Sequence, residues 1–424
     1  MTRWILSLLL VLGAYTSSLA DTYISGFVEA TQALRIQSNS VLDGGLGFQE
    51  RGYPRSDLRA QLKLSGGGDR DEYFLRMDFV SDPTHTGENS VDLREAFVKL
   101  HPHSWLDLKI GRQIATWGTG DLLFANDLFA KDWVAFFTGM DLGYLKRPQD
   151  LLRIGLYAGG TTLEIAASPH YTMDHLPNGE RLSIYNPFSA QTVNAQGAAP
   201  VQALPKDLKH AELFARVSGY MGGHEWALYG YRGFFPQPQG VIIVDSVPHL
   251  FAPRMSSLGA SLRGSVGSYL VNLESALYYS EDDSDGRDAT LPNSAVKLLA
   301  GVERNLGNEL TASAQWFGDL MMHYDEYTAP FLNSGIDPLA DELRHTVTLR
   351  LSKFLRYQTV RLNFFGYWGI SDHDTYLRPS VDYDFTDAMK ITLGANWLDG
   401  DQPHTMFGQF QNNSNVYGRI RYSF

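Results

Sequence analysis

Cysteine is absent from the 424 residues. Its absence excludes thiol catalysis, cysteine-based zinc or iron–sulfur sites, disulfides and a lipid anchor on cysteine. A basic excess is also lacking, because 35 Lys and Arg oppose 47 Asp and Glu for a net charge of −12. That balance argues against a general nucleic-acid binder. Glycine and aromatic residues are plentiful instead, and this mixture favours strands and turns over helices.

Long hydrophobic runs are lacking after the N-terminus. Residues 1–20 have the layout of a secretory signal peptide: Arg3 is positive, an apolar stretch follows, and residues 18–20 (Ser-Leu-Ala) form a small-x-small cleavage site. No later segment has 18 consecutive apolar residues, so we expect no transmembrane helix in residues 21–424. We therefore expect export through the Sec pathway, followed by either a soluble protein or a β-barrel.

Apolar residues recur at every second position after Asp21. Leu58, Ala60, Leu62 and Leu64 alternate with polar neighbours, and the same holds at 106–110 and 347–352. This alternation predicts strands with one apolar and one polar face. Segments of this kind number 18, with approximate starts at 23, 55, 72, 91, 104, 150, 161, 209, 224, 255, 268, 294, 308, 343, 358, 375, 388 and 411.

The connections between these segments alternate in length. Short ones such as 159–160 alternate with long ones such as 114–148 and 171–207. The pattern predicts an all-β protein, a transmembrane antiparallel up-and-down β-barrel of about 18 strands, with 16 still open, formed by residues 21–424. The first strand starts too close to the cleavage site for a plug domain to precede it. The alternative, a periplasmic or secreted β-sandwich, would be oversized for one domain.

Residues 93–98 read LREAFV and are followed by GRQ at 111–113 and WG at 117–118. These segments resemble porin-like outer-membrane barrels of Gram-negative bacteria, including the alginate-export type. The terminal Phe424 is similar to the recognition signal of such barrels. The resemblance implies residence in the outer membrane, contact with its lipid and lipopolysaccharide, and recognition of Phe424 by the barrel assembly machinery. A homo-oligomer is compatible with the resemblance, and no nucleic-acid partner is expected. The resemblance does not specify which solute is transported.

Polar residues between the outward apolar ones are predicted to line the pore. The set is more basic than acidic, which favours anions, whereas pairing across strands would leave the charges as a solvating layer. Arg112 shares the parity of Leu108 and Ile110, so we expect a bulge at Gly111 to turn it inward; the alternative places it at the outer rim. The pore-lining candidates are Arg59, Lys63, Arg76, Asp78, Glu95, Lys109, Arg112, Arg350, Arg361, Arg378, Arg419 and Arg421.

The connection 114–148 is too apolar for a purely solvated loop. Its aromatic residues favour a loop that folds into the mouth of the barrel and narrows it. The alternative is a loop packed on the outer rim or against a partner subunit. The constriction candidates are Phe124, Phe129, Trp133 and Phe136.

Signatures of catalysis are missing. The chain has no H-E-x-x-H, G-x-S-x-G or P-loop motif, and residues 282–286 lack the glutamate that closes a calcium loop. We expect no enzyme activity, metal or cofactor. The sequence favours an outer-membrane channel for small hydrophilic solutes with an anion preference. The alternatives are an export channel for an anionic polysaccharide or other secreted product, and an insulating barrel that sheaths a partner protein.

The cleavage site generates the first prediction. N-terminal sequencing of the protein extracted from outer membranes should begin at Asp21, because signal peptidase cuts after a small residue such as Ala20. Recovery of the protein in the soluble periplasmic fraction would contradict the barrel interpretation.

Overall fold

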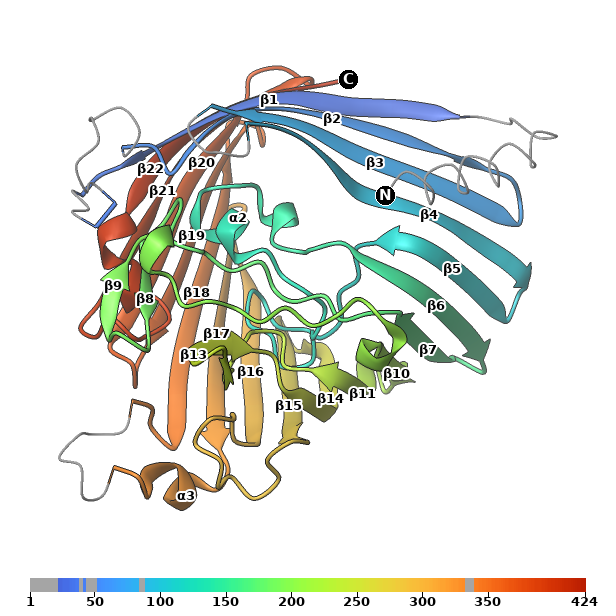
Figure 1. Ribbon diagram of the computed structural model, residues 1–424. Coiled ribbons are helices and arrows are strands. Elements are labelled where there is room, and N and C mark those ends of the chain that lie inside the picture. The colour runs from blue at the N-terminus through green and yellow to red at the C-terminus, as the bar shows by residue number, and fades with distance from the viewer. Residues whose placement is uncertain (1–21, 38–40, 43–51, 84–87, 332–338) are drawn as a thin grey trace.

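Eighteen strands form one closed antiparallel ring in the computed structural model, which describes residues 22–37, 41–42, 52–83, 88–331 and 339–424 (Figure 1). Consecutive barrel strands pair with each other, and β1 also pairs with β22 from Phe27–Ser423 to Arg35–Asn415. The barrel prediction is therefore confirmed, with 18 strands rather than 16. The predicted signal peptide lies outside the described residues.

Each strand start expected from the sequence lies within four residues of the start of an observed strand. Around the ring the strands are β1 (Tyr23–Arg35), β2 (Arg55–Gly67), β3 (Asp71–Asp82), β4 (Glu88–His103), β5 (Leu106–Gln113), β6 (Gln149–Ala158), β7 (Thr161–Ser168), β10 (Glu212–Met221), β11 (His224–Phe234), β14 (Arg254–Val266), β15 (Tyr269–Ser280), β16 (Ala295–Gly307), β17 (Leu310–Met321), β18 (Leu343–Leu355), β19 (Val360–Gly369), β20 (Asp374–Asp384), β21 (Met389–Gly400) and β22 (Asn415–Ser423).

The two faces of the strands differ as the alternation predicts. On β15, Leu273 and Leu277 point outward and are 46% and 36% exposed, whereas Glu274 and Tyr278 point inward and are buried. The same apolar outer face continues on other strands, for example at Leu258 and Leu393. Many inward side chains, such as Glu274 and Tyr278, are buried although the ring is wide, which means that other parts of the chain enter the interior.

Short turns gather at one end of the barrel and long loops at the other. Gly159 and Gly160 adopt positive φ (56° and 84°), the geometry that lets a two-residue turn follow the twist of a hairpin. Phe424 lies at the short-turn end, where its backbone exchanges two hydrogen bonds with Gly26 of 2.9 and 3.0 Å. The closing seam of the ring therefore extends to the last residue of the chain.

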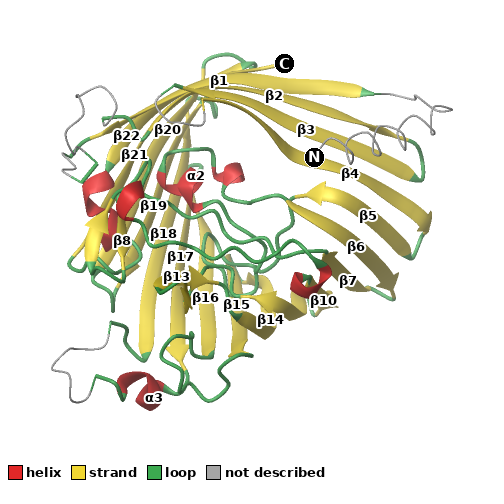
Figure 2. Cartoon of the chain, in the orientation of Figure 1, coloured by secondary structure: helices red, strands yellow, loops and turns green. Residues whose placement is uncertain are grey.

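The long loops carry the remaining elements (Figure 2). Two small hairpins, β8–β9 and β12–β13, and several short helices belong to them; none of the helices in the described part of the chain is long and apolar enough to cross a membrane. No separate plug domain occurs among the described residues. The segments that enter the interior are loops that connect barrel strands. The bounds are α2 (Trp133–Phe137), η1 (Leu142–Tyr144), β8 (Ile184–Asn186), β9 (Gln191–Val193), η2 (Ala195–Gly197), η3 (Leu208–His210), β12 (Gly240–Val244), β13 (Val247–Phe251), α3 (Tyr324–Thr328) and η4 (Gly408–Asn413).

Candidate functional site

The connection between β5 and β6, residues 114–148, runs through the inside of the ring, and we call it the crossing loop. Figure 1 shows its helix α2 surrounded by strands rather than outside them. The carboxylate of Asp132 caps α2 by accepting a hydrogen bond of 2.8 Å from the Ala135 backbone N–H. This cap starts a helical turn whose aromatic residues are almost all buried.

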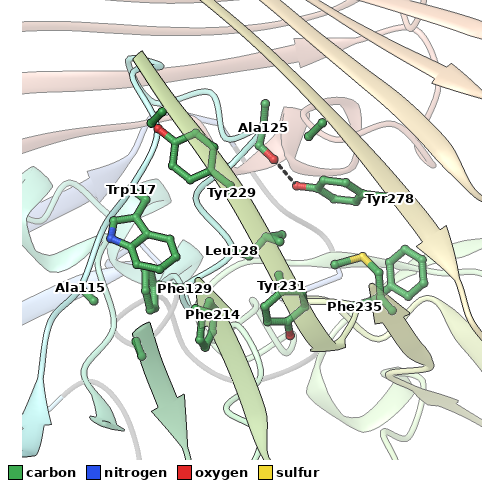
Figure 3. Close-up of a cluster of buried hydrophobic side chains, with 14 of the residues drawn as sticks. Ala115, Trp117, Ala125, Leu128, Phe129, Phe214, Tyr229, Tyr231, Phe235 and Tyr278 are labelled. Carbon is green, nitrogen blue, oxygen red and sulfur yellow. Dashed lines mark hydrogen bonds between the residues drawn. The ribbon is translucent and has the colours of Figure 1, made fainter. Parts of the chain in front are cut away.

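One end of the crossing loop packs on the β6–β15 wall (Figure 3). Phe129 stacks on Phe214 of β10 with ring centroids 4.4 Å apart, and Trp117 meets both rings edge-on. The hydroxyl of Tyr278 donates to the Ala125 carbonyl at 2.8 Å. Burial of these rings anchors the first half of the loop.

A carboxylate on the same wall holds the loop backbone. Glu274 of β15 accepts hydrogen bonds from the backbone N–H groups of Thr119 and Gly120 and, at 2.8 Å, from the Asn126 amide. No cation lies within 4.0 Å of Glu274 in the described part of the chain. Backbone dipoles therefore compensate this buried charge, which makes it a specific anchor for the loop.

The second half of the loop packs on the β19–β21 wall. Phe136 contacts Tyr376 of β20 edge-on at 5.3 Å, and the Tyr376 hydroxyl donates to the Phe136 carbonyl at 3.0 Å. Tyr367 of β19 donates likewise to the Leu122 carbonyl at 2.8 Å, so part of the first half of the loop also contacts this wall. The guanidinium of Arg378 lies 4.6 Å above the Phe136 ring. The loop thus joins two separate walls of the barrel.

A third contact reaches β2 and β3. The hydroxyl of Tyr144 donates to Asp78 at 2.6 Å, and the guanidinium groups of Arg59 and Arg94 lie 4.6 and 4.8 Å from its ring centroid. Burial raises the pKa of Tyr144 well above its usual value, so the hydroxyl stays protonated and keeps donating. Contacts on three walls place the crossing loop across the lumen and not on the outer rim.

All four aromatic constriction candidates lie in this packing. Phe129 and Phe136 contact the walls as described, Phe124 meets Trp133 edge-on at 6.1 Å, and the Trp133 indole N–H donates to Asp174 at 2.8 Å. Asp174 belongs to the next long loop, residues 169–211, so a second loop supports the crossing loop. The narrowing of a pore by these residues stays a prediction.

Most of the predicted pore-lining charges point inward and are paired. Asp78 accepts from Arg59 at 2.6 Å, Arg76 lies 3.0 Å from Glu95, and Arg350 lies 2.5 Å from Asp121 of the crossing loop. Glu29 of β1 lies between Arg419 and Arg421, at 3.6 and 2.6 Å. Because β1 lies between β22 and β2, the closure of the ring brings Arg419 and Arg421 close to the charges of β2 and β3.

Four of the predicted cations have no carboxylate within 4.0 Å in the described residues. Three of them lie against aromatic rings instead: Lys109 is 3.6 Å from the Phe97 centroid, Arg361 is 4.6 Å from that of Phe354, and Arg378 is 4.6 Å from that of Phe136. Arg378 lies on Phe136 with one unsatisfied N–H, and Lys63 is half-buried beside Arg76. Among the predicted pore-lining cations, these four are the ones that no carboxylate within 4.0 Å compensates in the described part of the chain.

The structure corrects the inward position predicted for Arg112. Gly111 has the positive φ (127°) that a bulge would use, but the pairing of β4 with β5 continues unbroken from Ala96–Arg112 to Leu100–Leu108. Arg112 therefore keeps the outward parity of Ile110 and lies 3.4 Å from Asp150 at the loop end of the barrel. The rim position, and not the inward one, is the position found.

The bulge lies on β4 instead. Arg76 pairs with Glu95 but Met77 pairs with Leu93, so Arg94 is an extra residue in the strand. Arg94 and Glu95 consequently both face inward, and sequence parity misses Arg94. Glu29 and Asp57 are also missed, although the two-residue period that places Arg59 inward would have placed Asp57 there too.

No family model matches this chain, and no curated protein matches it. Among solved structures the chain is similar to OmpF of Salmonella typhi in complex with daunomycin, with 10% identity, a TM-score of 0.46, and 95% of this chain and 97% of that one covered. It is also similar to the outer membrane channel DcaP of Acinetobacter baumannii, with 12% identity, a TM-score of 0.45 and the same coverage. A mutant porin of Rh. blastica covers 95% of this chain and 100% of its own, with 11% identity and a TM-score of 0.39.

Asp174 generates a pH prediction. Burial raises its pKa to about 6, against the opposing charge of Lys131. Folding therefore takes up a proton between the ordinary aspartate pKa of about 3.9 and pH 6, and the contribution of Asp174 to stability falls as the pH rises through that window. Because Trp133 donates to this carboxylate, tryptophan fluorescence should change with a midpoint near pH 6.

The variants Trp133→Phe and Asp174→Asn isolate this signal from the other tryptophans. The component near pH 6 should vanish in both. A component that persists in either variant, or a wild-type midpoint near pH 4, would contradict the assignment.

Proposed function

We propose that this protein is an outer-membrane channel through which small hydrophilic solutes diffuse, with the crossing loop as its constriction. The observation that carries the proposal is the crossing loop itself, which contacts three walls from inside a closed ring. A ring of 18 strands is wide, and porins of similar size enclose an aqueous channel. A loop through its middle converts a wide opening into a narrow, chemically selective one.

The two faces of the barrel support the membrane location. Leucines such as Leu228, Leu258 and Leu393 are more than half exposed on the outer face, and so continuous an apolar belt is costly in water but favourable in lipid. Closure through β1 and β22 leaves no unpaired strand edge inside that belt. The inner face carries charge and hydrogen-bonding groups, as a water-filled passage requires.

The inward cations support an anion preference. Fewer of them contribute to it than the sequence suggests. Pairing neutralises Arg59, Arg76 and Arg421, so these three add little net field. Lys63, Lys109, Arg361 and Arg378 lack such partners in the described residues. Positive charge in a low-dielectric wall raises the local concentration of anions.

Removing part of the crossing loop tests the constriction. Deletion of residues 121–137 should raise single-channel conductance in planar bilayers about twofold or more, because the segment that joins the walls is gone. The barrel should still assemble, since its strands pair with each other and not with the loop. Deletion of 242–247, the exposed tip of the β12–β13 hairpin, is the matched control and should change conductance little. Unchanged conductance in the 121–137 deletion would place the solute path elsewhere.

The anion preference is tested at unpaired cations. Arg421→Glu would place a carboxylate beside the buried Glu29, and Arg361→Glu would place one opposite its register partner Asp382. The neutral double change Lys63→Gln with Arg361→Gln is therefore the cleaner one. Reversal potentials in a salt gradient should shift toward cations, with the anion-to-cation permeability ratio falling about twofold or more, most strongly at low salt. Arg232→Gln, on the outer face, should have no such effect. A wild-type pore that already prefers cations would overturn the proposed preference.

A further inference from the structure

A pair of stacked aromatic rings lies on the inner wall of β3 and β4. The rings of Phe74 and Phe97 have centroids 5.3 Å apart and are inclined by 23°. Phe97 is buried, whereas Phe74 is only half-buried. Neither ring belongs to the two apolar clusters that anchor the crossing loop, so their packing is not explained by that loop.

In the row of inward residues that contains this pair, a small residue lies on either side of the two stacked rings. Across β1 to β5 the register places Tyr23, Ser65, Phe74, Phe97 and Gly111 side by side. Gly111 has no side chain beside Phe97, and the Lys109 ammonium occupies that face of the ring, 3.6 Å from its centroid. One end of the aromatic stack is therefore closed by a cation.

The other end of the stack is open. Ser65 is the only residue between Phe74 and Tyr23 in this row, and Tyr23 is 66% exposed. Neighbouring strands lie about 4.8 Å apart, so the Cα atoms of Tyr23 and Phe74 stand about 10 Å apart. Stacked rings have centroids about 4.5–7 Å apart, so this space admits one flat ring between the two aromatic side chains.

A second cation lies next to the opening. Lys63 is two residues from Ser65 on the same face of β2, and its register partners are Ser25 and Arg76. Arg76 is occupied by Glu95 at 3.0 Å, while Lys63 has no carboxylate within 4.0 Å among the described residues. An ammonium without a counter-ion beside an aromatic face is suited to a carboxylate carried by a flat ring.

We infer that Phe74, Ser65, Tyr23 and Lys63 form a binding subsite for organic anions in which a carboxylate is attached to a planar ring. The ring stacks on Phe74 above Ser65, and the carboxylate pairs with Lys63. The subsite lies toward the short-turn end of the barrel, away from the crossing loop. It rests on the proposed channel function, since it gives that channel a preferred class of solute.

Benzoate is the probe, with acetate and benzamide as matched compounds that lack the ring and the charge. The full-length protein is folded in detergent and binding is followed by saturation-transfer NMR, and the same protein in planar bilayers is tested for block of the ion current. Benzoate should bind and block at lower concentration than either matched compound. Loss of one stacked ring or one charge pair should raise its half-saturating concentration about three- to tenfold.

Variants locate the subsite. Phe74→Ala and Lys63→Gln should both produce that rise, and Ser65→Phe should abolish binding by filling the space, which keeps the test decisive if Phe74→Ala fails to fold. Phe354→Ala changes an aromatic residue on β18, and Arg263→Gln changes a cation on β14 that has no carboxylate within 4.0 Å among the described residues. Both variants should leave benzoate binding unchanged.

The two proposals fail in different ways. Benzoate that binds no better than acetate, or that binds Ser65→Phe as well as wild type, overturns the subsite while an open, ion-conducting pore leaves the channel intact. A silent bilayer together with benzoate binding that depends on Phe74 overturns the channel and supports the subsite.

Discussion

The hydrogen bonds between β1 and β22 are the constraint on which the rest of the molecule depends. They convert a curved sheet with two free edges into a ring in which every strand has two neighbours. In a closed ring, the side chains at every second position of a strand point out of the barrel and those between them point into it. The same seam places Glu29 between Arg421 and Arg419, so closure also assembles a charge cluster from the two ends of the sequence.

Filling the ring poses a second problem, because an interior of this width cannot be packed by strand side chains alone. The crossing loop solves it with two aromatic clusters on separate walls and with carboxylates that accept from its backbone. Glu274 is therefore a wall residue whose partners are loop groups, and Asp78 is shared between Arg59 of the wall and Tyr144 of the loop. This explains why they are buried although the strands that carry them face a lumen.

The lumen cations fall into two groups with different physical roles. Arginines such as Arg59 and Arg76 are neutralised by carboxylates and contribute to the stability of the wall. Lys109, Arg361 and Arg378 lie on aromatic faces, where the ring attracts the cation without cancelling its charge. Positive charge held in this way is not cancelled by a carboxylate, and the proposed anion preference rests on it.

The sequence alone determined the ring and its parity. Alternation at positions such as 58–64 predicts strands, short and long connections predict their order, and strand parity alone assigns Arg59, Asp78 and Arg378 to the interior. These features are local, since a side chain's face depends only on its neighbours along the strand. Tertiary structure decided the rest: the bulge at Arg94, the outward position of Arg112, the route of residues 114–148 and the partner of each charge. Those features depend on the register between strands and on contacts between residues far apart in the chain, which no local pattern encodes.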